Sequence, residues 1–402
     1  MTREIMTSEE RILAAINLEP YDRVPVAPLL SPSFPLRRKG MHTLDAYSKN
    51  ATVDATQAML DLYDEVGGWD GLVEVAAFPA LPPTSSIYHF YRFYYRGLRF
   101  PGLDQRLSDD SSPQFAEQET VKPEDYDEIL RVGWREFMEK NSERIVGKAP
   151  PPIEIRESRG KAQTAEYLRQ RELWNKKGVT VINGFTGMDP QMALTLLRTL
   201  QQFSLDVYRR PDKLKAVLDA WIDDFANDFL TAAKSSGEKL TKGIPGILMA
   251  CERGSGTYFN LKIFEKYVWP GIKRLVETWY SNGYVVTLHF DTNWTQNLPY
   301  LLQLPRKSCI VELDSTTDIF KAKEILKDHM CIMGDVPPQL SAYGTPQEME
   351  AYCKKLIDVV GKDTGFILST GCEQPPDTKY ENFKAMIDTG RNYYPHKQYT
   401  AK

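Results

Sequence analysis

The sequence predicts an α/β fold, and within that class a (β/α)8 TIM barrel with an inserted cap region. Eight short apolar segments typical of buried strands occur along the 402 residues, and most are followed by a helical pattern. Strands that alternate with helices of this length indicate parallel βαβ units, and eight such units close into a barrel. An open doubly wound sheet is the alternative, but the sequence contains neither GxGxxG nor GxxxxGK[ST]. We therefore expect one barrel domain over residues 1–402.

The individual elements follow from local signals. Thr7 and Glu10 form a capping-box pattern before apolar residues at helical spacing, which predicts the first helix. The predicted strands cover residues 23–30, 72–77, 179–183, 245–251, 284–289, 309–313, 330–334 and 365–370. The predicted helices between and after them cover residues 43–65, 190–206, 211–235, 261–281, 295–302, 317–328, 346–360 and 380–390.

Residues 81–175 depart from this alternation, and we interpret them as an insertion or cap on the barrel. Six aromatic residues fall within residues 88–95, and a helix is predicted over 123–141. The aromatic run either packs against the body or a subunit interface, or forms a lid whose rings stack on a flat substrate. His89 lies within this run and is therefore a candidate for ligand contact.

Composition excludes several classes of protein. The 50 basic and 54 acidic residues give a net charge of −4, which disfavours a nucleic acid as partner. No segment approaches the about 18 apolar residues of a membrane span, and the first residues lack the apolar core of a signal peptide. The five cysteines are widely spaced without a CxxC pair, unlike a disulfide framework or a zinc finger. We expect a soluble cytoplasmic protein, with homo-oligomerisation left open.

The residues with catalytic potential stand where the apolar strands end, because a barrel builds its active site at the carboxyl ends of its strands. These polar residues are Asn183, Glu252, His289, Asp291, Glu312, Asp314, Asp335, Cys372 and Glu373. Together they predict a ring of carboxylates around one imidazole and one thiol.

His289 and Asp291 are the most informative pair in this ring. Strand residues two apart point to the same face, so both side chains project in one direction. With Cys372 or Glu252, they supply the nitrogen, oxygen and sulfur ligands that zinc accepts, and a thiolate favours zinc over magnesium or calcium. A hydrogen-bonded histidine–aspartate pair without a metal is the alternative, and Cys372 fits a structural role equally well.

Both ends of the sequence resemble the uroporphyrinogen decarboxylase superfamily. The similarity is carried by residues 11–26 and 365–378, with residues 264–275 and 334–338 between them. It spans nearly the whole chain outside the predicted cap, and it implies a (β/α)8 barrel.

Within the superfamily, the sequence is more similar to the corrinoid-dependent methyltransferases than to the decarboxylases. Residues 31–38 stand where the decarboxylases carry an arginine-rich signature. His289 and Cys372 fall where the methyltransferases place zinc ligands, so the resemblance implies a zinc site. Asp291 stands where the coenzyme M methyltransferases carry cysteine, which leaves an oxygen-rich site with Glu252 as a further ligand.

The resemblance also implies a reaction and a partner. A corrinoid-binding DxHxxG motif is absent, so the corrinoid cofactor is expected on a separate corrinoid protein. The closest role is the substrate-specific methyltransferase of an O-demethylase system, which moves a methyl group from a methoxylated, aromatic substrate to a Co(I) corrinoid. Alternatives are a methylcobamide:thiol methyltransferase, a metal-free decarboxylase and a non-catalytic ligand-binding barrel.

Each predicted site residue has an expected role. Asp291 and Asp335 are the expected catalytic carboxylates. The expected zinc ligands are Glu252, His289, Asp291 and Cys372. The expected substrate contacts are Asn183, Tyr258, Trp294 and His89.

Overall fold

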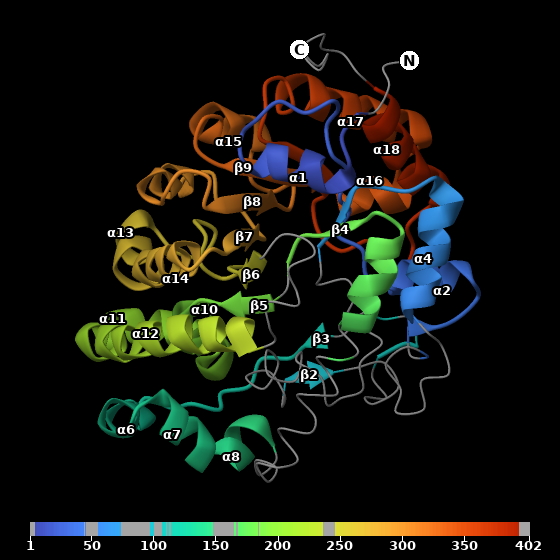
Figure 1. Cartoon of the computed structure of the whole chain (residues 1–402). Helices are drawn as coiled ribbons and strands as arrows, with labels where there is room; N and C mark the ends of the chain where they lie inside the picture. The colour runs from blue at the N-terminus through green and yellow to red at the C-terminus, as the bar shows by residue number, and fades with distance from the viewer. Residues whose placement is uncertain are drawn as a thin grey trace.

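Parallel strands lie at the centre of the molecule, and helices surround them (Figure 1). The computed structural model describes residues 5–43, 45, 55–73, 97–99, 107–109, 111, 114–147, 165, 168–183, 185–235 and 246–393. The predicted aromatic lid over residues 88–95, including His89, lies outside the described residues.

Six strands form one parallel sheet in which spatial order follows chain order. These strands are β5 (Phe185–Met188), β6 (Gly246–Ala250), β7 (Val285–Phe290), β8 (Cys309–Leu313), β9 (Cys331–Val336) and β10 (Phe366–Thr370). Their side chains are almost entirely buried on both faces wherever the structure describes them, as expected for strands enclosed by helices.

Shorter segments close this sheet into a barrel. Strand β1 (Gly71–Leu72) pairs in parallel with β4 (Thr180–Val181), which leads directly into β5. Val26 forms a parallel bridge with Leu368 of β10, and its carbonyl accepts the amide of Gly71 (3.0 Å). Eight parallel strand positions therefore complete a ring, and the predicted (β/α)8 barrel is confirmed.

Among the described residues, two predicted strands differ from those observed by more than two residues. The strand predicted over residues 23–30 is reduced to the bridge at Val26, because Pro25 and Pro28 cannot donate to a strand ladder. The third strand was expected to end at Asn183, and this expectation is wrong because pairing resumes in β5 and continues to Met188.

The described helices largely follow the predicted order. The early helices are α1 (Ser8–Ile16), α2 (Ser33–Arg38), α4 (Ala55–Val66), α6 (Asp125–Val132), α7 (Trp134–Lys140) and α8 (Ser142–Val146). The later ones are α10 (Pro190–Arg198), α11 (Leu200–Arg209), α12 (Pro211–Ser235), α13 (Leu261–Ile263), the π-helix η4 (Phe264–Val268), α14 (Trp269–Ser281), the 3-10 helix η5 (Leu298–Gln303), α15 (Ile319–Leu326), α16 (Pro338–Tyr343), α17 (Pro346–Val359) and α18 (Tyr380–Asn392).

Two single helices of the prediction are interrupted. Gly133 (φ 81°) separates α6 from α7, and Thr199 (φ 67°) separates α10 from α11. A positive φ cannot continue a right-handed helix, so the chain changes direction at each residue. Thr199 then caps α11 by accepting the amide of Gln202 (3.2 Å).

The described part of the insertion packs against the outer helices. Helices α6 to α8 lie outside α10 to α12 (Figure 1), and a short antiparallel pair forms between β2 (Leu98–Arg99) and β3 (Gln114–Phe115). Trp134 stacks on Trp221 of α12 with ring centroids 3.5 Å apart, and its Nε1 donates to the carbonyl of Val217 (3.1 Å). A cap over the strand ends stays a prediction for the aromatic run.

A buried network of charged side chains joins α1 to the first barrel segments. Arg11 donates to Asp22 through Nε (2.6 Å) and to Asp70 through Nη1 (2.6 Å). Arg23 donates to Asp70 through Nη2 (2.8 Å), and all four residues are at most 7% exposed. Such charges are tolerated in a core only while each remains paired.

Acid should destabilise the protein through Asp22. Burial alone would raise the pKa of Asp22, but hydrogen bonds from Arg11 and from the amides of Met6 and Ile5 lower it to about 2. The carboxylate therefore contributes about 2 kcal/mol above pH 4, and this contribution is lost as the pH falls from about 4 to 2. When the pH is lowered from 5 to 3, the urea concentration at the unfolding midpoint should fall further in the wild type than in the Asp22→Asn variant. Equal decreases would show that Asp22 does not carry this pH dependence.

Among the described helices, none combines the length and the apolar character needed to cross a membrane.

Candidate functional site

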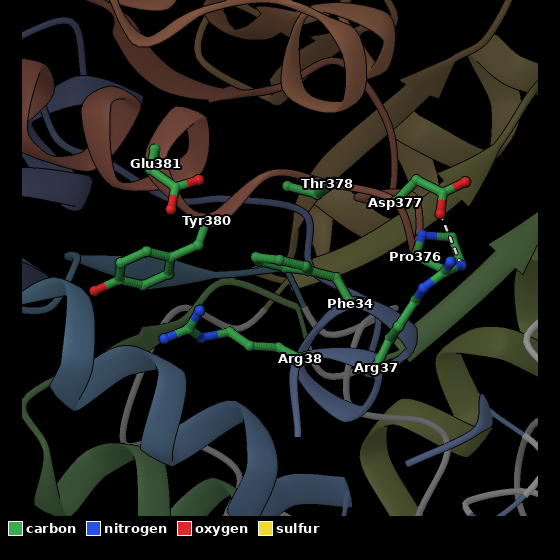
Figure 2. Close-up of a pocket in the computed structure, with 8 residues that line it drawn as sticks. All are labelled: Phe34, Arg37, Arg38, Pro376, Asp377, Thr378, Tyr380 and Glu381. Carbon is green, nitrogen blue, oxygen red and sulfur yellow. Dashed lines mark ion pairs between the residues drawn. The ribbon is translucent and has the colours of Figure 1, made fainter. Parts of the chain in front are cut away.

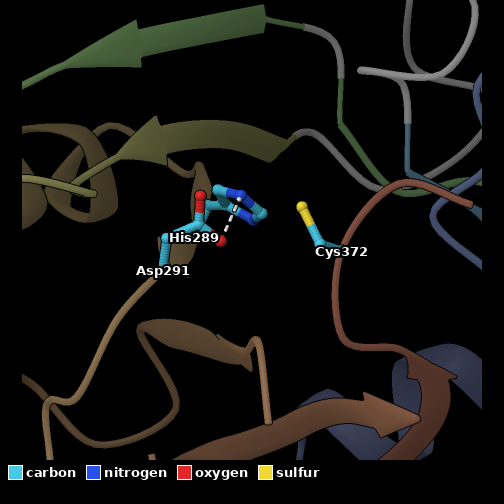
Figure 3. Close-up of side chains that lie close together, drawn as sticks. All are labelled: His289, Asp291 and Cys372. Carbon is cyan, nitrogen blue, oxygen red and sulfur yellow. Dashed lines mark ion pairs between the residues drawn. The ribbon is translucent and has the colours of Figure 1, made fainter. Parts of the chain in front are cut away.

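Three side chains meet at the carboxyl ends of two strands that are far apart in the sequence (Figure 3). His289 lies near the end of β7, Asp291 follows that strand, and Cys372 follows β10. One ligand atom from each of them lies within 4.8 Å of the other two, and Nε2 of His289 is 3.4 Å from Oδ1 of Asp291. Strands β8 and β9 separate β7 from β10 in the sheet, so barrel closure brings Cys372 to His289.

Glu312 orients His289. The two residues are register partners on β7 and β8, and Nδ1 of His289 hydrogen-bonds Oε2 of the fully buried Glu312. This bond leaves Nε2 as the ring nitrogen that faces Asp291 and Cys372. Metal-binding histidines are typically held in this way, with the distal nitrogen on a carboxylate.

The electrostatics of the site favour a cation. Burial disfavours the charged imidazole, but the carboxylates of Glu312 and Asp291 raise the pKa of His289 well above its usual value. Burial raises the pKa of Glu252 and of Glu373 to about 7 each, and the charge of Asp291 adds to both increases. A bound divalent cation stabilises the ionised forms of such crowded carboxyl groups.

The donor set fits zinc. His289, Asp291 and Cys372 offer nitrogen, oxygen and sulfur, which are the three ligand types of protein zinc sites. A thiolate in the set disfavours magnesium and calcium. These three residues would hold the ion and would leave part of its coordination open to water or substrate, as in catalytic rather than structural zinc sites.

Glu252, the fourth predicted ligand, does not belong to this group of three. It follows β6 by two residues, and the charges of Asp291 and His289 both act on its pKa. Its Oε2 is buried and has no hydrogen-bond partner among the described residues. Glu252 is therefore a carboxylate beside the cluster, with an acceptor available to a further group.

Asn183 lies in the interior of the barrel and not at the carboxyl end of its strand. Its Oδ1 accepts the hydroxyl of Thr287 (2.9 Å), which precedes His289 by two residues on the same face of β7. The expected placement at a strand end is therefore wrong, because the third strand continues through β5 beyond this residue.

Trp294 is a core residue in the structure. It is 1% exposed, and its ring stacks on Phe290 with centroids 3.9 Å apart. Its Nε1 donates to the carbonyl of Asp291 (2.8 Å), so it supports the backbone of a candidate ligand. A direct contact between Trp294 and a substrate stays a prediction.

Asp335 and Tyr258 do not belong to the three-residue cluster. Asp335 is 2% exposed and accepts the hydroxyl of Tyr352 on α17 (2.8 Å), while burial raises its pKa to about 7. Asp335 therefore contacts a barrel helix, and a catalytic role for it stays a prediction. Tyr258 is 41% exposed in the turn after β6, where a substrate contact stays a prediction.

Asp189 is a strand-end carboxyl that the sequence analysis missed. It is fully buried and caps α10, with Oδ1 accepting the amides of Gln191 (2.9 Å) and Met192 (3.2 Å). Burial raises its pKa to about 7, and the charge of Glu252 contributes. The signal was present, since an aspartate directly before Pro190 marks the start of a helix that follows a strand.

Glu312→Gln should weaken metal binding without unfolding the barrel. Glutamine has the shape of glutamate but lacks its charge, so the histidine loses basicity while its packing is retained. We expect zinc affinity, measured by competition with a chromogenic chelator, to fall about 10-fold to 100-fold. Unchanged affinity would contradict the orienting role of Glu312.

The fold and the site together define a (β/α)8 barrel with a candidate metal centre at the carboxyl ends of its strands. Residues 149–393, more than half of the chain, match the family described as Uroporphyrinogen decarboxylase (URO-D). The chain belongs to this family, which confirms the resemblance seen in the sequence.

Similar proteins include both decarboxylases and methyltransferases. The methylcobamide:CoM methyltransferase MtbA of Methanosarcina mazei is 28% identical over 173 residues, which is 42% of this chain and 48% of MtbA. A uroporphyrinogen decarboxylase of Vesicomyosocius okutanii is 29% identical over 90 residues, which is 22% of this chain and 26% of that protein. The chain thus spans about a quarter to a half of these relatives.

A solved structure supports the barrel architecture. A methyltransferase from Methanosarcina mazei superposes with a TM-score of 0.61 over 96% of this chain and 99% of its own, at 16% identity. This similarity supports the barrel fold.

Proposed function

We propose that this protein is a zinc-dependent methyltransferase that moves a methyl group from a methoxylated aromatic substrate to the Co(I) corrinoid of a separate corrinoid protein. The observation that carries the proposal is the convergence of His289, Asp291 and Cys372, with His289 oriented by Glu312. Similarity to MtbA over 42% of the chain supports the corrinoid partner.

The chemistry of an aryl methyl ether explains why such a site is needed. The leaving group is a phenolate, so transfer requires stabilisation of negative charge that develops on the ether oxygen. Zinc, when bound, supplies a Lewis acid for that oxygen.

The residues of the site would have separate roles in the reaction. His289, Asp291 and Cys372 would hold the metal, and Glu312 would fix the imidazole. Glu252, with a buried acceptor atom beside the cluster, would be available to hold a proton or to accept a hydrogen bond from the substrate. Tyr258, exposed after β6, would contribute the edge of the substrate site.

A methylcobamide:thiol methyltransferase is the second candidate, and the similarity to MtbA favours it. Asp291 distinguishes the two functions. With the carboxylate of Asp291 in place of a thiolate, a bound zinc would be more electrophilic, which would favour activation of an ether oxygen over activation of a thiol.

The decisive experiment follows the oxidation state of cobalt. The full chain, loaded with zinc, is incubated with a reduced corrinoid protein and with methoxylated aromatics, methanol, methylamines or coenzyme M. We expect loss of the Co(I) absorbance with methoxylated aromatics, together with release of the corresponding phenol.

Three other outcomes would contradict the proposal. Turnover of methylcobamide with coenzyme M alone would identify the thiol methyltransferase. Release of CO2 from uroporphyrinogen without metal would identify a decarboxylase. Tight association with the corrinoid protein without any turnover would identify a non-catalytic barrel.

A further inference from the structure

A cleft that shares no lining residue with the metal cluster is shown in Figure 2. Its volume is about 470 Å3. It lies between the last turn of α2 and the chain that leads from β10 into α18. The cleft is lined by Phe34, Arg37, Arg38, Pro376, Asp377, Thr378, Tyr380 and Glu381. Both lining segments follow the carboxyl end of a barrel strand, which places the cleft on the catalytic face.

Arg37 and Asp377 form the ion pair that spans this cleft (Figure 2). Their nearest atoms are 2.7 Å apart, and the two side chains are 46% and 56% exposed. Exposed ion pairs of this kind contribute little net stability. A carboxylate from a ligand could therefore replace that of Asp377 on the guanidinium of Arg37 at little cost.

Arg38 is held in place beside an aromatic wall. Its Nε and Nη2 donate to Glu65 (3.0 and 2.6 Å), and its guanidinium carbon lies 3.8 Å from the ring centroid of Tyr380. Tyr380 is fixed in turn, because its hydroxyl donates to the carbonyl of Glu65 (3.1 Å). A planar cation and a ring fixed in this way offer a flat ligand a prepared surface.

We propose that this cleft is a binding site for planar monocarboxylates, such as aromatic carboxylates. The carboxylate would bind Arg37, and the flat body would lie along Arg38 and Tyr380. One negative charge is favoured over two, because Asp377 and Glu381 also face the cleft and would repel a phosphate dianion.

The site is separate from the metal cluster, and the inference does not depend on the proposed methyl transfer. Pro376 follows Cys372 by four residues on the same loop. An occupied cleft would therefore lie beside the loop that supplies the thiol.

Benzoate titrated into the full chain by isothermal calorimetry tests the inference. We expect Arg37→Gln and Arg38→Gln to weaken benzoate binding at least about 10-fold. Arg274→Gln is the matched control, because Arg274 also forms an exposed ion pair, with Asp223 on α12, and lies on α14. His289→Ala should bind benzoate like the wild type, which separates this cleft from the barrel mouth.

The Asp377→Asn variant shows that a loss of benzoate binding in the arginine variants does not simply reflect misfolding. Removing the competing carboxylate should tighten benzoate binding several-fold, an effect that structural damage does not produce. Three results would overturn the inference: benzyl alcohol binding as tightly as benzoate, inorganic phosphate binding more tightly, or benzoate binding that survives Arg37→Gln but not His289→Ala.

Discussion

Replacing His289 with alanine should abolish zinc binding and methyl transfer together. In the proposed zinc site, His289 would supply the nitrogen ligand, because its Nε2 is the ring atom that faces Asp291 and Cys372. Loss of an outer hydrogen-bond partner of a metal ligand reduces metal affinity by up to about 100-fold. Loss of one of three direct ligands should reduce it further. We expect metal analysis to find about one zinc per wild-type chain and only traces in the variant, with Co(I) methylation lost in parallel.

His329→Gln is the matched control for this experiment. His329 hydrogen-bonds the carbonyl of Leu304 (2.9 Å) and does not belong to the metal-ligand group. The His329→Gln variant should retain zinc and activity. Full activity of His289→Ala in a metal-free preparation would refute the zinc-dependent function.

Replacing Asp70 with asparagine should lower the free energy of unfolding by about 3–5 kcal/mol. The carboxylate of Asp70 receives hydrogen bonds from two buried arginines, Arg11 and Arg23, and from the amide of Val26 (2.9 Å). The substitution leaves two buried positive charges with one carboxylate, that of Asp22, in this network. Urea unfolding at pH 7, monitored by circular dichroism, measures the change.

Asp64→Asn is the control for surface charge. Asp64 pairs with Lys177 (2.6 Å), but its side chain is 55% exposed, so the loss should not exceed about 1 kcal/mol. Similar losses of unfolding free energy in the two variants would show that burial does not determine how much the Asp70 network contributes to stability.

Local patterns predicted those elements whose signals are short-range. The capping box of Thr7 and Glu10 forms as expected, and residues 309–313 form a strand with the predicted bounds. The interruption at Thr199 had no local signal, because a threonine with positive φ is held by its surroundings and not by its own preference.

The candidate site was also predictable from local patterns only in part. The spacing of His289 and Asp291 already placed both side chains on one face, because strand residues alternate with a period of two. The distance from His289 to Cys372 depends on barrel closure across two intervening strands, which no local pattern contains.

The sequence by itself determined the class of fold and the residue types that could bind a metal. Those properties reside in hydrophobic periodicity and side-chain chemistry, which are readable residue by residue. Only the tertiary structure decided which candidates meet. It brought Cys372 to His289, placed Glu312 on Nδ1, left Glu252 beside the cluster and directed Asp335 to α17. Strand register and barrel closure set these distances, and both arise from contacts between segments far apart in the chain.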